Sequence, residues 1–180
     1  MPRKVILYIA VSLDGFIADQ AGKIDWLETT TEFMEEDNRY AQFYATIDTV
    51  ILGRTTYDQV VNELAPGNYP YQDATSYVLT SRPGENLENV IFTQEDLSLL
   101  VKKLKSQPGK EIWLVGGSSV VMPLLKANLI DEYQISTLPI ILGKGIRLFT
   151  DFEPSLVLET VTSSLKNGIV TTTYRKPQEG

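Results

Sequence analysis

The 180-residue sequence contains no cysteine and no histidine. Without cysteine, the protein can form no disulfide bond and offers neither a thiol nucleophile nor a cysteine ligand for zinc. Without histidine, it lacks the most common general base and metal ligand, and a serine–histidine triad is excluded. Any proton transfer must therefore use aspartate, glutamate, lysine, tyrosine or water, and we expect no metal site.

Long apolar segments and a surplus of basic residues are missing as well. No segment approaches the roughly 20 apolar residues that span a bilayer, so we expect a cytoplasmic protein without membrane association. Asp and Glu number 23 against 16 Lys and Arg, which gives a net charge of −7 and argues against a nucleic-acid partner. The length and the ordinary composition, 43% hydrophobic and 22% charged, predict one domain covering residues 1–180.

The apolar residues that are present gather in short segments typical of buried strands. Val, Ile and Leu dominate these segments without alternating with polar residues, and such strands are usually covered on both faces of a parallel sheet. The expected strands lie at 5–11, 49–52, 76–79, 89–92 and 112–115. Helical patterns lie between or after them, at 32–47, 56–64, 95–105 and 118–127. Strands that alternate with helices indicate an α/β fold with right-handed crossovers.

The last third of the chain has a different pattern. Strands are expected at 132–138, 156–162 and 168–174, and no helical pattern separates the final two. Asn167-Gly168 is a dipeptide typical of a tight hairpin turn. We therefore expect a C-terminal antiparallel hairpin beside a mostly parallel sheet.

Three polar segments directly follow expected strands. They are Gly53-Arg54-Thr55-Thr56, Thr80-Ser81-Arg82 and Gly116-Gly117-Ser118-Ser119. A glycine turn that leads into a helix presents backbone N–H groups to an anion, and arginine offers planar, charge-assisted donors to phosphate. Each segment alone also suits an ordinary turn or a solvated surface, but three of them at strand ends predict a nucleotide-binding cleft.

These segments, taken in order, resemble the dihydrofolate reductase superfamily, and within it the branch typified by the reductase domain of bacterial riboflavin biosynthesis. The resemblance covers nearly the whole chain and rests on Ile9-Ala10, Asp14-Gly15-Phe16-Ile17, Gly53-Arg54-x-Thr56, Leu79-Thr80-Ser81 and Val115-Gly116-Gly117. It implies a dihydrofolate reductase-like α/β fold with a mostly parallel eight-stranded sheet and flanking helices. It also implies NADPH as the cofactor, a small heterocyclic substrate and a homodimer.

The resemblance assigns the phosphates of NADPH to the three polar segments. Gly116 and Gly117, often joined by a cis peptide in the family, would lie at the pyrophosphate, where Ser118, Ser119 and Val120 would supply N–H groups. Gly53, Arg54 and Thr56 would form a second phosphate-binding segment, and Thr80, Ser81 and Arg82 would surround the adenosine 2′-phosphate. No carboxylate occurs among the last three residues, which favours NADPH over NADH because a carboxylate there would bind a free 2′-hydroxyl.

The nicotinamide and the proton are assigned to other residues. By the same resemblance, Ala10 and Ile17 would line the nicotinamide pocket beneath a mobile loop at about 14–26. Asp37 falls inside the apolar stripe of the helix expected at 32–47, where a carboxylate is costly unless it is hydrogen-bonded or protonated. It also lies sixteen residues before Gly53, the offset at which dihydrofolate reductases carry the acidic residue that binds the pterin. We expect Asp37 to be the catalytic carboxylate; the alternative is that it belongs to the acidic first turns of a helix.

The substrate is predicted from departures as much as from matches. No Lys or Arg lies between Arg54 and Arg82, where a folate-specific enzyme carries a cation for the glutamate of its substrate. The substrate-side threonine of dihydrofolate reductases is replaced by Ile135, and residues 131–133 and 138–149 resemble the riboflavin branch. The expected activity is therefore most like 5-amino-6-(5-phosphoribosylamino)uracil reductase; the alternatives are dihydrofolate reductase-type activity or a catalytically silent dinucleotide-binding protein.

Overall fold

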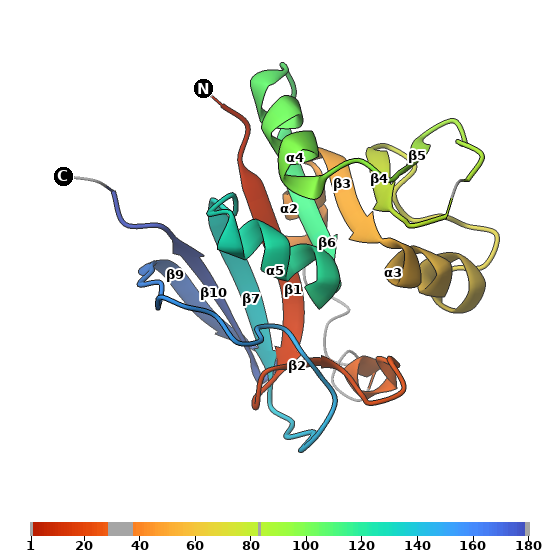
Figure 1. Cartoon of the computed structure of the whole chain (residues 1–180). Coiled ribbons are helices and arrows are strands. Elements are labelled where there is room, and N and C mark those ends of the chain that lie inside the picture. The colour runs from red at the N-terminus through yellow and green to blue at the C-terminus, as the bar shows by residue number, and fades with distance from the viewer. Residues whose placement is uncertain (1, 29–37, 83, 179–180) are drawn as a thin grey trace.

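The computed structural model describes residues 2–28, 38–82 and 84–178. Its centre is an eight-stranded sheet with the strand order β5-β4-β3-β6-β1-β7-β10-β9 (Figure 1). The strands are β1 Val5–Ser12, β3 Ile47–Gly53, β4 Thr75–Leu79, β5 Val90–Thr93, β6 Glu111–Gly116, β7 Glu132–Leu138, β9 Glu159–Lys166 and β10 Ile169–Arg175. All neighbours from β5 to β7 are parallel, whereas β10 pairs antiparallel with both β7 and β9. The expected α/β fold, with its mostly parallel sheet and C-terminal hairpin, is confirmed.

The central strands are apolar throughout because both faces of the sheet are covered. On one face, Leu7 of β1 packs in a core cluster with α4 (Leu97–Ser106) and α5 (Ser118–Lys126). On the other face, Ile6 packs in a cluster with Phe43 of α2 (Arg39–Tyr44). Figure 1 shows α4 and α5 in front of the sheet and α2 behind it. All residues of β1, on both faces of the strand, are therefore buried or half-buried. The continuous apolar sequence of the strand predicted this.

The helix expected at 32–47 ends earlier than its sequence pattern. The structure gives α2 as Arg39–Tyr44, and Ile47 already belongs to β3. The Thr46 hydroxyl donates a 2.6 Å hydrogen bond to the carbonyl oxygen of Phe43, which satisfies one of the carbonyl groups at the end of the helix. The predicted end at residue 47 was therefore wrong, and residues 32–37 of the expected helix lie outside the described residues.

Two short strands were not predicted. β2 (Phe16–Ala18) and β8 (Ile146–Arg147) pair antiparallel and form a small second sheet beside β1. The segment 14–26, expected as a mobile loop, therefore contains a strand and also a 3-10 turn at Asp25–Leu27. Strand β9 begins at residue 159 rather than 156.

Asp14 fixes the turn between β1 and β2. Its carboxylate accepts hydrogen bonds from the Ser12 hydroxyl at 2.6 Å and from the backbone N–H of Gly143 at 2.8 Å. The Ser12 hydroxyl in turn accepts from the N–H of Phe16 at 2.9 Å. These bonds connect the start of β2 to the segment that leads into β8.

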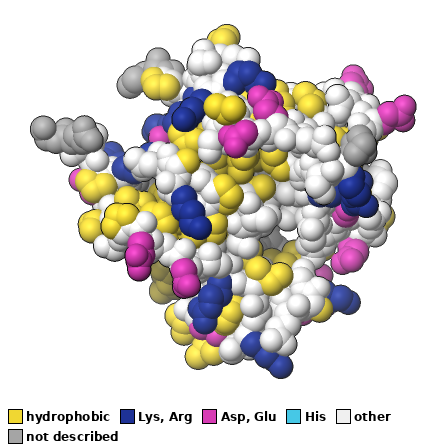
Figure 2. All heavy atoms as spheres, in the orientation of Figure 1, with side chains coloured by type: hydrophobic (Ala, Val, Ile, Leu, Met, Phe, Trp, Pro, Cys, Tyr) yellow, Lys and Arg dark blue, Asp and Glu magenta, His cyan; other side chains and the backbone are white. Residues whose placement is uncertain are grey.

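The surface carries mixed charge. On the face that Figure 2 shows, basic and acidic side chains are interspersed.

Within the described ranges, no helix has the length and apolar composition to cross a bilayer. The described residues also contain no group of three or more acidic side chains placed to hold a metal ion.

Candidate functional site

A cleft of roughly 1150 Å³ lies at the carboxyl ends of the parallel strands β1, β3, β4 and β6. All thirteen residues that the sequence predicted for cofactor binding line it. They are Ala10, Ile17, Gly53, Arg54, Thr56, Thr80, Ser81, Arg82, Gly116, Gly117, Ser118, Ser119 and Val120. The structure therefore brings together four stretches of sequence that lie far apart along the chain; the role of each residue stays a prediction.

The turn between β6 and α5 forms the middle of the cleft. Gly116 has φ +125° and a cis peptide bond to Gly117, the residue that precedes the first turn of α5. A Cβ atom on Gly117 would lie 3.7 Å from the Thr56 hydroxyl oxygen, so the turn passes close to the helix that follows β3. The first amides of α5 come from Ser118 and Ser119, and such amides precede the hydrogen-bond ladder of a helix.

Val120 lies in the first turn of α5. Its side chain lines the cleft and is buried, but its N–H already donates a 3.0 Å hydrogen bond to the carbonyl oxygen of Gly117. The sequence assigned this N–H to a phosphate. In the structure this N–H closes the first turn of α5 and the side chain forms part of an apolar wall; its role toward a phosphate stays a prediction.

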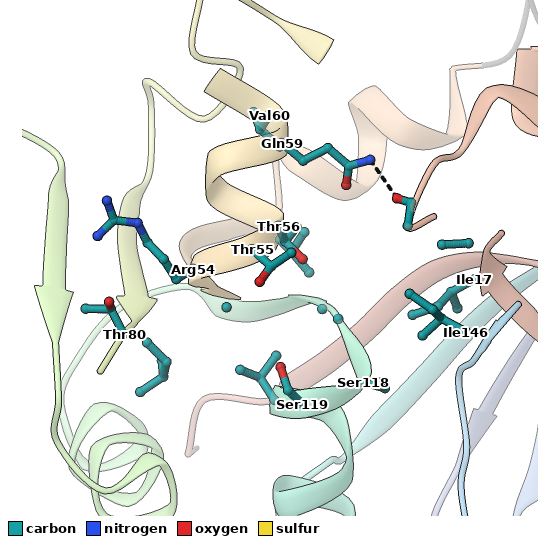
Figure 3. A pocket seen from close by; sticks show the side chains of 18 of the residues that line it. Ile17, Arg54, Thr55, Thr56, Gln59, Val60, Thr80, Ser118, Ser119 and Ile146 are labelled. Atoms are coloured by element: carbon teal, nitrogen blue, oxygen red, sulfur yellow. Dashed lines mark hydrogen bonds between the residues drawn. The ribbon is translucent and has the colours of Figure 1, made fainter. Parts of the chain in front are cut away.

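The turn between β3 and α3 (Arg54–Gln59) forms the opposite wall. Figure 3 shows Thr55 and Thr56 of α3 facing Ser118 and Ser119 of α5 across the cleft. The Arg54 Nε atom donates a 2.9 Å hydrogen bond to Asp58 Oδ1, and its guanidinium carbon lies 4.9 Å from the centre of the Phe92 ring. Arg54 is therefore held on two sides while it remains part of the cleft wall.

The segment after β4 lines the end of the cleft where Arg54 lies. The N–H of Arg82 donates to the Thr80 hydroxyl at 3.1 Å, and the Gln94 side-chain amide donates to the carbonyl oxygen of Ser81 at 2.7 Å. Arg82 is 69% exposed, and its Nη2 atom lies 3.7 Å from Asp58 Oδ2. Two guanidinium groups, two hydroxyl groups and the start of α3 thus converge at one end.

The other end of the cleft is apolar. Ile17 of β2 and Ile146 of β8 lie together there (Figure 3), and Ala10 of β1 also lines the cleft. The Gln59 side-chain amide donates a 2.9 Å hydrogen bond to the carbonyl oxygen of Gly22, which links α3 to the turn after β2. Charged phosphates suit the first end, and a flat apolar ring suits this one.

The register of β7 places Ile135 opposite Ile9 of β1. Its side chain packs on the side of the sheet covered by α5. Ser136 pairs with Ala10 of β1 and forms a 2.9 Å hydrogen bond to the Thr171 hydroxyl of β10. Ile135 and Ser136 point to opposite faces of the sheet, because the side chains of a strand alternate. That Ile135 replaces the substrate-side threonine stays a prediction.

Asp37, the predicted catalytic carboxylate, lies outside the described residues. Among the described residues near the start of α2, Tyr40 packs with Tyr8 and Tyr44. Burial, together with these two tyrosines, raises the pKa of the Tyr40 hydroxyl to about 12. Burial likewise raises the pKa of Tyr71, which lines the cleft. Both hydroxyls stay protonated at neutral pH, so they can donate hydrogen bonds but cannot act as bases.

Several residues of the cleft were missed from the sequence. They include Gln59, Tyr71, Thr93, Gln94, Glu95 and Leu97. Gln59 follows Thr55 by four residues and Thr56 by three on α3, and residues at these spacings share one face of a helix. The helix period could therefore have predicted Gln59 as a cleft residue. No pattern marked Tyr71, because it comes from an irregular segment between α3 and β4.

Comparisons with known proteins agree on one family. The family described as RibD C-terminal domain matches residues 3–171. The uncharacterized protein YwjB of Bacillus subtilis (strain 168) is 48% identical over 151 residues, which cover 83% of this chain and 84% of that protein.

Solved structures share the fold. A protein from Shewanella sp. PV-4, provisionally assigned to riboflavin biosynthesis, superposes with a TM-score of 0.86 at 30% identity over 99% of this chain and 100% of its own. Dihydrofolate reductase from Enterococcus faecalis, solved with NADP(H), gives a TM-score of 0.69 at 20% identity over 97% of each chain. At that identity the second likeness concerns the fold alone.

Proposed function

The chain belongs to the RibD C-terminal domain family, and from that premise we propose that it is an NADPH-dependent reductase that transfers hydride to a pyrimidine- or pterin-like heterocycle. The activity it would most resemble is the 5-amino-6-(5-phosphoribosylamino)uracil reductase of riboflavin biosynthesis. One observation carries the proposal: thirteen residues predicted from separate sequence motifs line a single cleft large enough for a dinucleotide.

The chemistry of the cleft fits NADPH. Arg54 and Arg82 bring two permanent positive charges to one end, beside the hydroxyl groups of Thr80 and Ser81. The Glu95 carboxylate also lines the cleft, but it accepts hydrogen bonds from Lys103 at 3.0 and 3.1 Å. The two guanidinium groups and two hydroxyl groups suit a ribose that carries a 2′-phosphate better than one with a free 2′-hydroxyl.

The protein would position and shield the reactants. When bound, NADPH supplies the hydride. Ala10, Ile17 and Ile146 would keep water away from the face where hydride leaves, since their side chains are apolar. Asp37 would hold the substrate heterocycle and tune the supply of its proton, as the sequence predicts.

A ribosylamino-pyrimidine suits the cleft better than folate. Among the described residues that line it, the cations are Arg54 and Arg82, and both are assigned to the cofactor. The glutamate of a folate would then have no arginine or lysine partner among those residues. This observation favours a substrate without that carboxylate, and dihydrofolate reductase-type activity is the second candidate.

Binding and turnover test the proposal separately. NADPH at a hundred times its dissociation constant should stabilise the protein by about 2.7 kcal/mol, or about 5–10 °C in melting temperature for a chain of this size. It should also quench the fluorescence of Trp26 or Trp113. No binding at millimolar NADPH would contradict the proposal.

Oxidation of NADPH, followed by its absorbance, should then be faster with a ribosylamino-pyrimidine than with dihydrofolate. Equal or faster turnover of dihydrofolate would favour the second candidate. Binding without turnover of any heterocycle would leave a silent dinucleotide-binding protein.

The proposal includes a homodimer. Strand β9 is an edge of the sheet and all eight of its residues are exposed, and such edges pair readily with another chain. Light scattering should give twice the chain mass of 20.2 kDa. A mass equal to one chain would contradict this part of the proposal.

A further inference from the structure

The two arginines of the cleft share one carboxylate that is not itself part of the cleft wall. Asp58 Oδ1 accepts from Arg54 Nε at 2.9 Å, and Asp58 Oδ2 lies 3.7 Å from Arg82 Nη2. Both arginines line the cleft. Asp58 lies behind them and bridges a helix to the segment after β4.

The sequence places this carboxylate by helical spacing. Asp58 follows Arg54 by four residues on α3, so the two side chains lie on the same face of the helix. Arg82 reaches the other carboxylate oxygen from a different part of the chain. Because Arg54 uses its Nε for Asp58, its two terminal nitrogens remain for a ligand.

Two guanidinium groups that approach the same carboxylate would repel each other if that carboxylate were absent. The carboxylate offsets one of the two positive charges and leaves a net charge of +1 for the three side chains. It also limits the rotation of two long side chains that would otherwise lose conformational entropy when a ligand binds. A site whose donors are already held in place binds its anion more tightly.

We propose that Asp58 is the positioning residue that sets the preference of the cleft for NADPH over NADH. It holds Arg54 and Arg82 together so that both reach the 2′-phosphate, the only part of the cofactor that distinguishes the two dinucleotides. This inference rests on the proposed function, because it assigns the arginine end of the cleft to that phosphate.

Asp58 could also weaken NADPH binding by electrostatic repulsion, and this effect would change the dissociation constant in the opposite direction. A carboxylate near a phosphate site repels the phosphate, and removing it would raise the local positive charge. If repulsion dominated, loss of Asp58 would tighten NADPH binding. If positioning dominates, the same loss weakens NADPH binding and leaves NADH binding unchanged.

The experiment compares dissociation constants of NADPH and NADH by tryptophan fluorescence in four proteins. They are the wild type, Asp58→Ala, Asp58→Asn and the control Glu159→Ala, which removes a carboxylate from the ion pair with Arg175 on β10. Asp58 is 36% exposed, so we expect all four to fold, and thermal melts check this.

We expect Asp58→Ala to weaken NADPH binding about tenfold, the loss typical of one charge-assisted hydrogen bond, and NADH binding less than twofold. Asp58→Asn keeps an oxygen that can accept from Arg54 Nε, so its loss should be smaller. Glu159→Ala should match the wild type.

Unchanged or tighter NADPH binding in Asp58→Ala would overturn the inference while the proposed function stands. So would an equal loss for both dinucleotides. A wild type that binds neither dinucleotide would overturn the proposed function, and the inference with it.

Discussion

Gly145 is the residue whose replacement should do most damage beside the cleft. It has φ +152°, and a Cβ atom there would lie 2.2 Å from the carbonyl oxygen of Ala18. Ala18 belongs to β2 and pairs with Ile146 of β8. A side chain at Gly145 would therefore push apart the two strands that carry Ile17 and Ile146 into the cleft.

The size of the effect follows from two costs. A backbone conformation that only glycine adopts readily costs about 1–3 kcal/mol for another residue, and forcing a methyl group into a filled space costs about 1–3 kcal/mol more. Alanine also restricts the unfolded chain, which returns about 0.4–1 kcal/mol. We expect Gly145→Ala to lower the free energy of unfolding by about 3 kcal/mol, which is about 6–12 °C in melting temperature for a chain of this length.

Gly143→Ala is the matched control. Gly143 has φ +79° and no atom within 4 Å of an added Cβ, so its replacement carries the conformational cost of about 1 kcal/mol without the collision. Both variants share the effect on the unfolded chain, and differential scanning calorimetry would measure the difference between them. If Gly145→Ala melted at or above the temperature of Gly143→Ala, the close approach of β2 to residue 145 would be refuted.

Three further perturbations test the site and its surroundings. Arg54→Gln should weaken NADPH binding about ten- to a hundredfold through loss of charge-assisted hydrogen bonds, measured by fluorescence titration; an unchanged dissociation constant would remove Arg54 from the site. Asp37→Asn should lower turnover and spare NADPH affinity, whereas an unchanged rate in the NADPH oxidation assay would make Asp37 structural. The Ser12 hydroxyl, followed by backbone N–H groups and against a desolvation effect, holds the pKa of Asp14 below 3.8. That contribution to stability is complete above about pH 5 and is lost as the pH falls through the folded-state pKa, so Asp14→Asn should flatten the acid side of the melting-temperature profile, and an unaltered slope would contradict the assignment.

Much of the fold was predictable because local chemistry and tertiary structure agree. The apolar segment before Gly116 is typical of a strand covered on both faces and forms β6, and Asn167-Gly168 does lie between β9 and β10. The cleft was predictable for the same reason: each of its polar segments follows a buried strand, and the carboxyl ends of parallel strands meet at one edge.

The errors arose where tertiary context decides. β2 and β8 contain three and two residues, too few for a periodic pattern. Asp14 holds the turn beside them through residues far apart in the sequence, Ser12 and Gly143. The pairing of Ile135 with Ile9 could not be predicted either, because the register of a strand depends on its partners rather than on its own residues. The Arg54–Asp58 pair could be predicted from the helical period. The contact of Asp58 with Arg82 could not, because it depends on how two distant segments of the chain pack together.

The position of β1 has a consequence for how the protein folds during synthesis. This strand is synthesised before the other strands of the sheet, yet it lies in the middle of the sheet, where Val5 pairs with Ile112 of β6 and Ile6 with Glu132 of β7. Until β6 has been made, β1 has no partner on either side, and its second neighbour, β7, follows later still. The many distant pairings of such a sheet slow its closure. Since Ala10 lies on β1, the two ends of the cleft join only at that late step, so the nascent chain has to keep this apolar strand from other partners until most of the sequence has been translated.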